Sequence, residues 1–280
     1  MYPIYDFGGA GDIFHVALAN GFPPQTYAPM VAPFVSDYHV VNLMPRALWD
    51  DETPPNTLSS WKHSVAQDLQ NGIVQHDWRN IIAVGHSFGG IATLLTAIQQ
   101  PVRFKAVILL DPTILPRPYM KALQISRLLG RKASSGLAER AEKRKISFES
   151  ANVAYDYFKG KKLFADWHED AFRGYIHSLK PMPDGTVTLG WKREWEAYYF
   201  RTLYASTWGD LPKLRGKMPL LLIRGANSDT LVESVAKQIC KILPDMTYHE
   251  IAGHGHLFPQ SAPQQTADII QNWLKGLPKN

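Results

Sequence analysis

The sequence predicts an α/β protein in which helices flank a mostly parallel sheet. Short apolar runs alternate with amphipathic stretches, a pattern typical of parallel strands joined by helical crossovers. The alternation stops at residue 113 and resumes near residue 208, and the residues between have helical spacing without a convincing strand. An insertion of this length is too long for a bare loop. We therefore expect a helical cap at 113–207, inserted after the sixth strand, on a sheet domain of residues 1–112 and 208–280.

The alternation of apolar runs and amphipathic stretches predicts where each strand and helix lies. Strands are expected at 13–19, 38–43, 80–85, 104–110, 219–225 and 246–251. Helices are expected at 25–35, 59–75, 89–100, 231–242 and 262–274. An earlier apolar run at 3–7 is a candidate hairpin partner of the strand at 13–19, joined to it through the glycine-rich turn at 8–11.

Composition restricts the class of protein. Of the 280 residues, 45% are hydrophobic and 20% are charged, values that fall in the ordinary globular range. No apolar run approaches the ~20 residues needed to cross a bilayer, and the start of the chain does not resemble a secretory signal. The single cysteine, Cys240, excludes an internal disulfide and fits a reducing compartment. We expect a soluble, cytoplasmic protein without stable membrane insertion, and the sequence does not indicate its oligomeric state.

The net charge of +5 is concentrated in one segment. Residues 113–145 hold nine Lys and Arg residues but only Glu139 and Glu142. This segment has neither interleaved aromatic residues nor a known reading motif, so nucleic-acid binding is not predicted. We interpret the segment as a solvated helical face. The alternative is electrostatic attraction for anionic substrates or membrane surfaces.

The most informative motif lies where the strand at 80–85 meets the helix at 89–100. The sequence there reads Gly85-His86-Ser87-Phe88-Gly89-Gly90, which fits the G-x-S-x-G pattern of a nucleophile elbow. A tight strand-to-helix turn lifts the serine Oγ clear of the sheet, and the flanking glycines leave room for it. The motif predicts Ser87 as a nucleophile and His86 as a structural hydrogen-bonding residue.

A serine nucleophile needs a base and a group that orients the base. In chains with such an elbow, the order is Ser, then Asp or Glu, then His. One later strand runs into Asp229, and the last strand runs into His254 and His256. We predict Asp229 as the carboxylate and His256 as the base, because glycines bend the loop before His256. The alternatives are Asp111, which follows another strand in an Asp-Pro turn, and His254.

Attack by Ser87 on a carbonyl also requires two N–H donors for the oxyanion. We predict the backbone N–H groups of Phe88, the residue after the nucleophile, and of Phe22, in the loop after the strand at 13–19. The glycine-rich turn at 8–11 is a rival, but it precedes that strand. The remaining histidines have no ligand-like spacing, so no metal site is predicted, and the chemistry requires no cofactor.

Four blocks together resemble the capped α/β-hydrolase family. They are Asn20-Gly21-Phe22-Pro23, the elbow, the stretch from Arg224 to Asp229, and Gly253-His254-Gly255-His256. The resemblance covers the sheet domain and implies the triad Ser87, Asp229 and His256, with Phe22 and Phe88 at the oxyanion hole. Many members carry His where this chain has Asn20.

The resemblance implies a serine hydrolase. Because position 87 is Ser, acyl transfer to water is expected, on a carboxylic ester, thioester or lactone. The alternatives are a carbon–carbon bond hydrolase of the same fold and a small-molecule receptor or scaffold with little turnover. The cap is rich in aromatic residues between Tyr155 and Phe200. Most should form its core, and a subset should line an apolar pocket over Ser87 that sets the choice of substrate.

Overall fold

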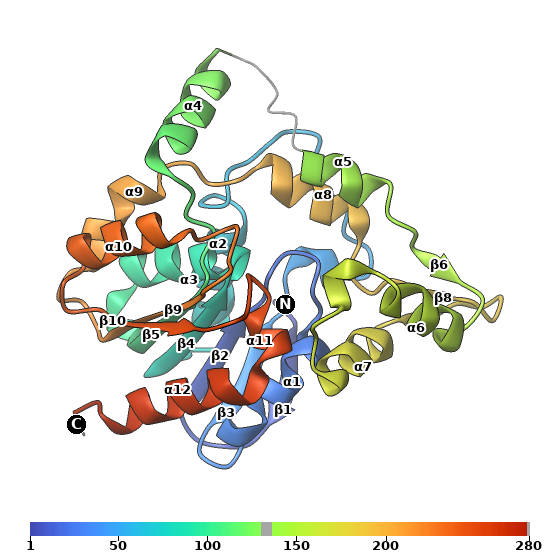
Figure 1. The fold of residues 1–280 in the computed structure, drawn as a ribbon, viewed down its shortest axis with the longest axis horizontal. Coiled ribbons are helices and arrows are strands. Elements are labelled where there is room, and N and C mark those ends of the chain that lie inside the picture. The colour runs from blue at the N-terminus through green and yellow to red at the C-terminus, as the bar shows by residue number, and fades with distance from the viewer. Residues whose placement is uncertain (130–135, 279–280) are drawn as a thin grey trace.

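The computed structural model describes residues 1–129 and 136–278, and within them a seven-stranded sheet is flanked by helices (Figure 1). The strand order is β1-β3-β2-β4-β5-β9-β10. The strands are β1 (Ile4–Gly8), β2 (Ile13–Ala17), β3 (His39–Leu43), β4 (Ile81–His86), β5 (Phe104–Leu110), β9 (Leu220–Gly225) and β10 (Thr247–Ile251). Every pair is parallel except β1 with β3, which confirms the mostly parallel sheet that the sequence predicts.

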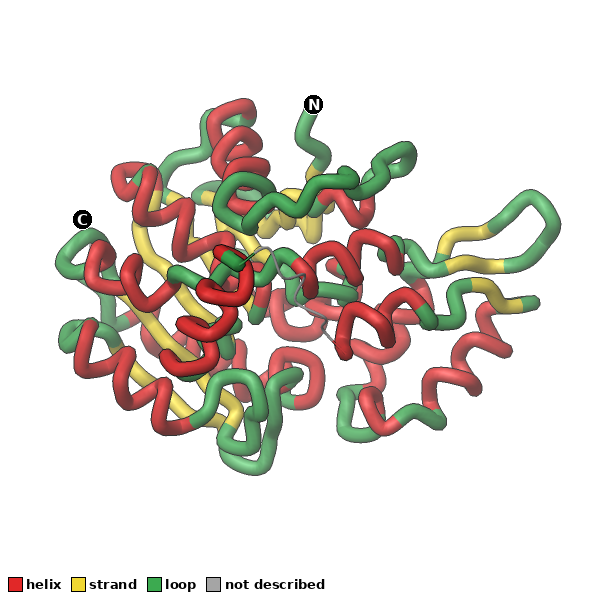
Figure 2. The backbone as a smooth tube through the Cα atoms, turned by 90° about the horizontal axis from the view of Figure 1, so that it is seen from above, coloured by secondary structure: helices red, strands yellow, loops and turns green. Residues whose placement is uncertain are grey.

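Helices cover both faces of this sheet (Figures 1 and 2). Helices α1 (Ala28–Val31) and α12 (Pro263–Lys275) pack together on one face. The opposite face carries α2 (Val65–Gln75), α3 (Phe88–Gln99) and α10 (Glu233–Ile242). Strands β4 and β9 are buried along their whole length, as expected for parallel strands that are covered on both sides.

The helix expected at 25–35 is divided into short turns. These are the 3-10 turns η1 (Pro24–Tyr27) and η2 (Ala32–Phe34) with α1 between them. Prolines at positions 24, 29 and 33 lack the N–H groups that a continuous helix would use. The other 3-10 turns are η3 (Arg46–Leu48), η4 (Pro101–Arg103), η5 (Lys162–Phe164) and η6 (Leu211–Leu214).

The first strand does not form the expected hairpin. Strand β1 pairs antiparallel with β3 at the edge of the sheet, because both edges of β2 are already occupied by β3 and β4. The glycines between β1 and β2 adopt positive φ, and a Cβ on Gly9 would lie 2.0 Å from the Tyr38 carbonyl oxygen. The glycine-rich segment therefore packs against the chain that leads into β3.

Residues 113–207, called the insert from here on, lie between β5 and β9. Its helices are α4 (Arg117–Leu128), α5 (Gly136–Glu142), α6 (Ala151–Lys159), α7 (Glu169–His177) and α8 (Arg193–Arg201). It also holds a small sheet of β6 (Ser147–Phe148), β8 (Val187–Thr188) and β7 (Lys180–Pro181). Strands of two residues are too short to leave an alternating pattern in the sequence. The insert follows the fifth strand of the described chain rather than the sixth, because only five strands precede it.

The aromatic residues of the insert belong to two cores. One group, Phe158, Phe164, Trp167, Phe172 and Tyr175, packs within the insert. A second group, Trp191, Trp195, Tyr198 and Tyr199, joins the core of the sheet. Helix α8 therefore anchors the insert to the sheet. Helices α9 (Thr207–Asp210) and α11 (Phe258–Ser261) complete the chain.

The carboxyl ends of the parallel strands meet at one edge of the sheet, as the parallel pairing of β2, β4, β5, β9 and β10 requires. The segments that follow these strands are thus brought together from distant parts of the sequence. In the described ranges, no helix combines the length and apolar character required to span a membrane.

His15 on β2 is buried, and its Nε2 accepts a hydrogen bond from the Leu43 N–H at 3.1 Å. Burial lowers the pKa of His15 from 6.5 to about 3, because a protonated ring would lose its hydration. Below pH 6.5 the unfolded chain therefore binds a proton that the folded chain does not. The contribution to stability is complete above this pH and is lost as the pH falls toward 3.

We therefore expect the free energy of unfolding to fall by about 1.4 kcal/mol per pH unit below pH 6.5 for the proton at His15. Urea unfolding curves between about pH 7 and about pH 5 measure this slope. The slope should be smaller in His15→Gln, because this variant removes the titrating group from the buried position. Equal slopes in wild type and His15→Gln would contradict the prediction.

Candidate functional site

Ser87 occupies a strained turn between β4 and α3. Its backbone has φ 55° and ψ −115°, a conformation that is costly for a residue other than glycine. A Cβ on Gly85 would lie 2.7 Å from the Gly89 carbonyl oxygen, and one on Gly89 would lie 2.4 Å from that of Ala17. The Ser87 N–H donates to the Leu110 carbonyl at 3.0 Å. The turn thus has the strand-to-helix geometry that the motif predicts.

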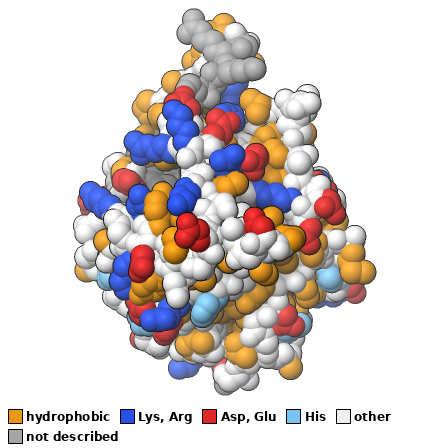
Figure 3. Space-filling view, turned by 90° about the vertical axis from the view of Figure 1, so that its right-hand side faces the viewer, with side chains coloured by type: hydrophobic (Ala, Val, Ile, Leu, Met, Phe, Trp, Pro, Cys, Tyr) orange, Lys and Arg blue, Asp and Glu red, His pale blue; other side chains and the backbone are white. Residues whose placement is uncertain are grey.

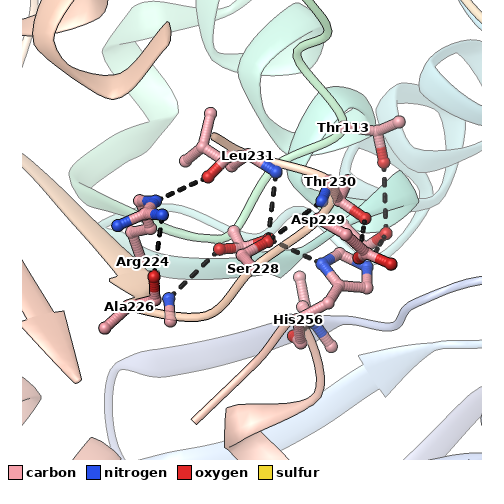
Figure 4. A network of polar contacts seen from close by, with 12 residues as sticks. Thr113, Arg224, Ala226, Ser228, Asp229, Thr230, Leu231 and His256 are labelled. Atoms are coloured by element: carbon pink, nitrogen blue, oxygen red, sulfur yellow. Dashed lines mark hydrogen bonds and ion pairs between the residues drawn. The ribbon is translucent and has the colours of Figure 1, made fainter. Parts of the chain in front are cut away.

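His256 lies in the loop after β10 and makes a hydrogen bond with each of its ring nitrogens. Its Nε2 is 2.8 Å from Ser87 Oγ, and its Nδ1 is 2.6 Å from Asp111 Oδ2. Thr113 Oγ1 is a second partner of Ser87 Oγ at 3.1 Å (Figure 4). The structure therefore brings Ser87 and His256 together, as predicted, and adds the Thr113 hydroxyl, which no motif in the sequence indicates.

Asp111 follows β5 and has no exposed surface. Besides His256, its carboxylate accepts hydrogen bonds from the Gly225 N–H at 3.2 Å and from the Ser228 hydroxyl at 2.5 Å. Three donors, two from the end of β9 and its following turn and one from the loop after β10, thus surround a carboxylate that would otherwise be costly to bury. Its backbone, with φ 42°, is another uncommon conformation that the surrounding structure holds.

The structure corrects the prediction that Asp229 orients His256. Asp229 is exposed, and its carboxylate is 3.4 Å from the Thr230 hydroxyl. Neighbouring side chains in this turn after β9 point in different directions. Ser228 is buried against Asp111, whereas Asp229 lines a cavity whose wall also includes His256. The carboxylate on His256 is Asp111, the alternative candidate.

The turn that carries Ser228 is held by hydrogen bonds (Figure 4). The N–H groups of Thr230 and Leu231 both donate to Ser228 Oγ at 3.1 Å, so the Ser228 proton is directed toward the carboxylate of Asp111. The buried side chain of Arg224 donates to the Leu231 carbonyl at 2.6 Å. Ser228 is thus a fixed hydrogen-bond donor to Asp111. It directly precedes Asp229, the residue that the sequence pattern predicts as the carboxylate.

His86 supports the loop of His256, in the structural role predicted for it. The Tyr27 hydroxyl accepts from the Ala19 N–H at 2.9 Å and lies 2.7 Å from His86 Nδ1, and His86 Nε2 lies 3.0 Å from the His256 carbonyl. Burial, with a smaller effect of His256, lowers the pKa of His86 well below its usual value. The neutral ring therefore accepts from Tyr27 and donates to the carbonyl of His256.

The two predicted oxyanion donors differ in their surroundings. Phe88 is the first residue of α3, where a backbone N–H has no partner within the helix. The Phe22 N–H instead donates to the Ala19 carbonyl at 3.3 Å, near the long end of the hydrogen-bond range. The loop of Phe22 is tied to the insert, because the side-chain amide of Asn20 donates to the Glu196 carbonyl at 3.0 Å.

A cavity of about 770 Å³ lies between this site and the insert. Ser87 and His256 form part of its wall on the sheet side. The aromatic residues in its wall are Phe22, Trp61, Phe88, Tyr119, Tyr157, Phe158, Phe164 and Phe200. The structure thus identifies which aromatic residues of the insert face the cavity. In the part of the chain that is described, no group of three or more His, Cys, Asp or Glu side chains is arranged to hold a metal ion.

Comparisons with known proteins agree with this architecture. A family model described as "Alpha/beta hydrolase family" matches residues 13–269. A relative, the uncharacterized hydrolase YugF of Bacillus subtilis (strain 168), is 26% identical over 220 residues, in a match that covers 73% of this chain and 69% of the relative. The structure of E-2-(acetamidomethylene)succinate hydrolase aligns with a TM-score of 0.78 and 16% identity, over 98% of this chain and 94% of that one. The peroxisomal alpha-beta-hydrolase Lpx1 of Saccharomyces cerevisiae aligns with a TM-score of 0.72 and 15% identity, over 99% and 83%.

The pairing of His256 with Asp111 can be tested by proton NMR. A short hydrogen bond to a carboxylate shifts the Nδ1 proton of histidine far downfield. We expect this signal in wild type, its loss in Asp111→Asn and its retention in Asp229→Asn. A His256→Gln variant assigns the signal, and circular dichroism checks that each variant is folded. Loss of the signal in Asp229→Asn alone would assign the carboxylate to Asp229 instead.

Proposed function

The chain belongs to the alpha/beta hydrolase family, and we propose that it is a serine hydrolase acting on small ester-type substrates through an acyl-enzyme. Carboxylic esters, thioesters and lactones are the substrates that fit this chemistry. The observation that carries the proposal is the pair of hydrogen bonds on His256, to Ser87 Oγ at 2.8 Å and to Asp111 Oδ2 at 2.6 Å. This arrangement supports transfer of a proton from a nucleophile to an oriented base.

The proposed reaction has two steps. In the first, Ser87 Oγ attacks the carbonyl carbon while His256 Nε2 takes its proton, and Asp111 stabilises the imidazolium through the Nδ1 proton. His256 then protonates the leaving alcohol or thiol, and the acyl group remains on Ser87. In the second step, water attacks the acyl-enzyme with His256 again as the base. The carboxylic acid is released and the Ser87 hydroxyl is restored.

Negative charge on the attacked carbonyl oxygen needs donors that are already in place. The Phe88 N–H, at the N-terminus of α3, is the donor that the geometry supports most directly. We assign the second position to the Phe22 N–H, which exchanges its long bond to the Ala19 carbonyl for one to the oxyanion.

The insert is proposed to act as a cap that sets substrate choice. Its aromatic side chains Tyr119, Tyr157, Phe158, Phe164 and Phe200 face the same cavity as Ser87. A cavity of about 770 Å³ has the size of small-molecule sites, which are largely apolar with few polar groups. An apolar acyl or aromatic part of the substrate would bury its surface against these rings.

Labelling with a fluorophosphonate probe tests the nucleophile. We expect wild type to react covalently at Ser87 and Ser87→Ala not to react, because the probe requires an activated serine. Hydrolysis of p-nitrophenyl esters with acyl chains of increasing length then measures which acyl group the cavity prefers. A folded wild-type protein that shows no Ser87-dependent labelling would refute the proposed function.

The two aspartates should differ strongly in kinetics. For Asp111→Asn we expect kcat to fall by about 10³-fold or more, because the imidazole loses the group that fixes its tautomer. Asp229→Asn removes an exposed carboxylate and should change kcat by less than about 10-fold. Rates with the preferred p-nitrophenyl ester check both values. A larger loss in Asp229→Asn than in Asp111→Asn would contradict the assignment.

A further inference from the structure

The cavity beside Ser87 carries an excess of positive charge. Among the described residues that line it, seven are Lys or Arg and two, Glu196 and Asp229, are acidic. Five of the seven come from the basic segment 113–145, namely Arg127, Arg140, Lys143, Arg144 and Lys145. The interpretation of this segment as a solvated face is therefore incomplete, because these residues also reach the cavity. Arg131 and Lys132 of the same segment lie outside the described residues.

The charge is distributed unevenly around the cavity. All seven cations, including Lys161 and Arg201, belong to the insert, whereas Ser87 and His256 lie on the sheet side. Figure 3 shows Lys and Arg side chains gathered on the upper part of the face where the insert lies, with acidic side chains among them. A ligand in the cavity would thus meet the nucleophile on one side and positive charge on the other.

Two of the seven cations have carboxylate partners. Arg144 Nη1 is 2.6 Å from Glu196 Oε2, and Arg201 Nη2 is 2.8 Å from Glu142 Oε1. The other five have no carboxylate oxygen within 4.0 Å in the ranges that the structure describes. We call these five, Arg127, Arg140, Lys143, Lys145 and Lys161, the cationic wall.

Arg127 is the most enclosed member of the cationic wall. Its guanidinium donates to the Leu203 carbonyl at 2.6 Å and to the Arg201 carbonyl at 3.1 Å, and burial lowers its pKa from the usual value. Carbonyl groups fix the position of the guanidinium without neutralising its charge. Since a guanidinium has five N–H donors, those not used by these carbonyls remain for a ligand.

Two lysines of the cationic wall are held by an aromatic ring. The Nζ atoms of Lys145 and Lys161 lie 5.4 Å and 4.2 Å from the centre of the Tyr157 ring, and Tyr157 itself lines the cavity. Cation–π contacts of this kind orient an ammonium group and leave its charge unneutralised. The lysines are thus gathered beside one cavity-lining ring.

We propose that the cationic wall binds an oxyanion group of the substrate, a carboxylate or a phosphate, placed away from the carbonyl that Ser87 attacks. The inference rests on the proposed hydrolase function and names its substrate class. Unpaired charges of one sign in a concave site attract the opposite charge strongly, and arginine matches the geometry of carboxylate and phosphate oxygens. The substrate is then an ester or thioester with an anionic end that faces the insert.

Two matched substrate pairs test this inference and separate the two oxyanions. Mono-p-nitrophenyl glutarate and p-nitrophenyl valerate have acyl chains of equal length and differ in a terminal carboxylate or methyl group. Butyryl-coenzyme A and S-butyryl-N-acetylcysteamine are thioesters with and without phosphates. In at least one pair, we expect kcat/KM of the anionic member to exceed that of its partner by about 10-fold or more. Added NaCl should reduce this ratio.

Variants then connect the preference to the cationic wall. Arg127→Met should lower the ratio of anionic to neutral kcat/KM by about 10-fold. Because Arg127 also binds two carbonyls, the double variant Arg140→Gln/Lys143→Gln provides a second test at exposed positions. Lys121→Met is the matched control. It removes a charge from the same helix as Arg127 at an exposed position outside the cavity wall, and should leave the ratio unchanged.

The outcomes separate this inference from the proposed function. If both neutral partners are hydrolysed as fast as the anionic members, the inference is overturned and the hydrolase function stands. If no substrate shows Ser87-dependent hydrolysis, the cationic wall is tested by calorimetric titration of Ser87→Ala with glutarate and with inorganic phosphate. Salt-sensitive binding that Arg127→Met weakens would support the wall, and absence of binding would overturn it.

Discussion

A carboxylate removed from water must be surrounded by hydrogen-bond donors, and in this molecule that requirement falls on Asp111. Its oxygens accept from the Gly225 backbone, the Ser228 hydroxyl and the His256 ring. Gly225 is the last residue of β9, Ser228 lies in the turn after β9, and His256 lies in the loop after β10. The carboxylate therefore joins the ends of two later strands to the end of β5. The position of His256, and with it the bond to Ser87, depends on this convergence.

A second set of contacts holds the same loop from the other side. His86, buried and neutral, connects the Tyr27 hydroxyl to the His256 carbonyl. The His256 backbone is thus held from the β4 side and its ring from the β5 side. Together with the strained turn at Ser87, these contacts fix the relative positions of Ser87 and His256, which is the preorganisation that the proposed reaction requires.

The sequence predicts the features that nearby residues determine. It does not predict those that depend on contacts between distant residues. Ser87 and the loop of His256 were identifiable because glycines and hydrophobic runs near them define their turns. The choice between Asp111 and Asp229 was not decidable from sequence, because it depends on which of two adjacent side chains after β9 points inward. There Ser228 takes the inward position.

The remaining differences also arise from packing between distant segments. The partner of β1 is set by which strand edges are free, and nothing near Gly8–Gly11 encodes that choice. Likewise, helical spacing marks Arg127 and Lys143 as surface residues, but only the packing of the insert over the sheet makes part of that surface the wall of a cavity.

The contact between Ser228 and Asp111 restricts which side chains these two positions can carry together. Both side chains occupy the space below the His256 ring, one from the end of β9 and one from the end of β5. A carboxylate introduced at position 228 would enter the region that Asp111 fills now, with Asn or Ser at 111 as its donor. Because two adjacent buried carboxylates repel each other, a carboxylate at 228 is compatible with the His256 contact only if position 111 loses its own carboxylate at the same time.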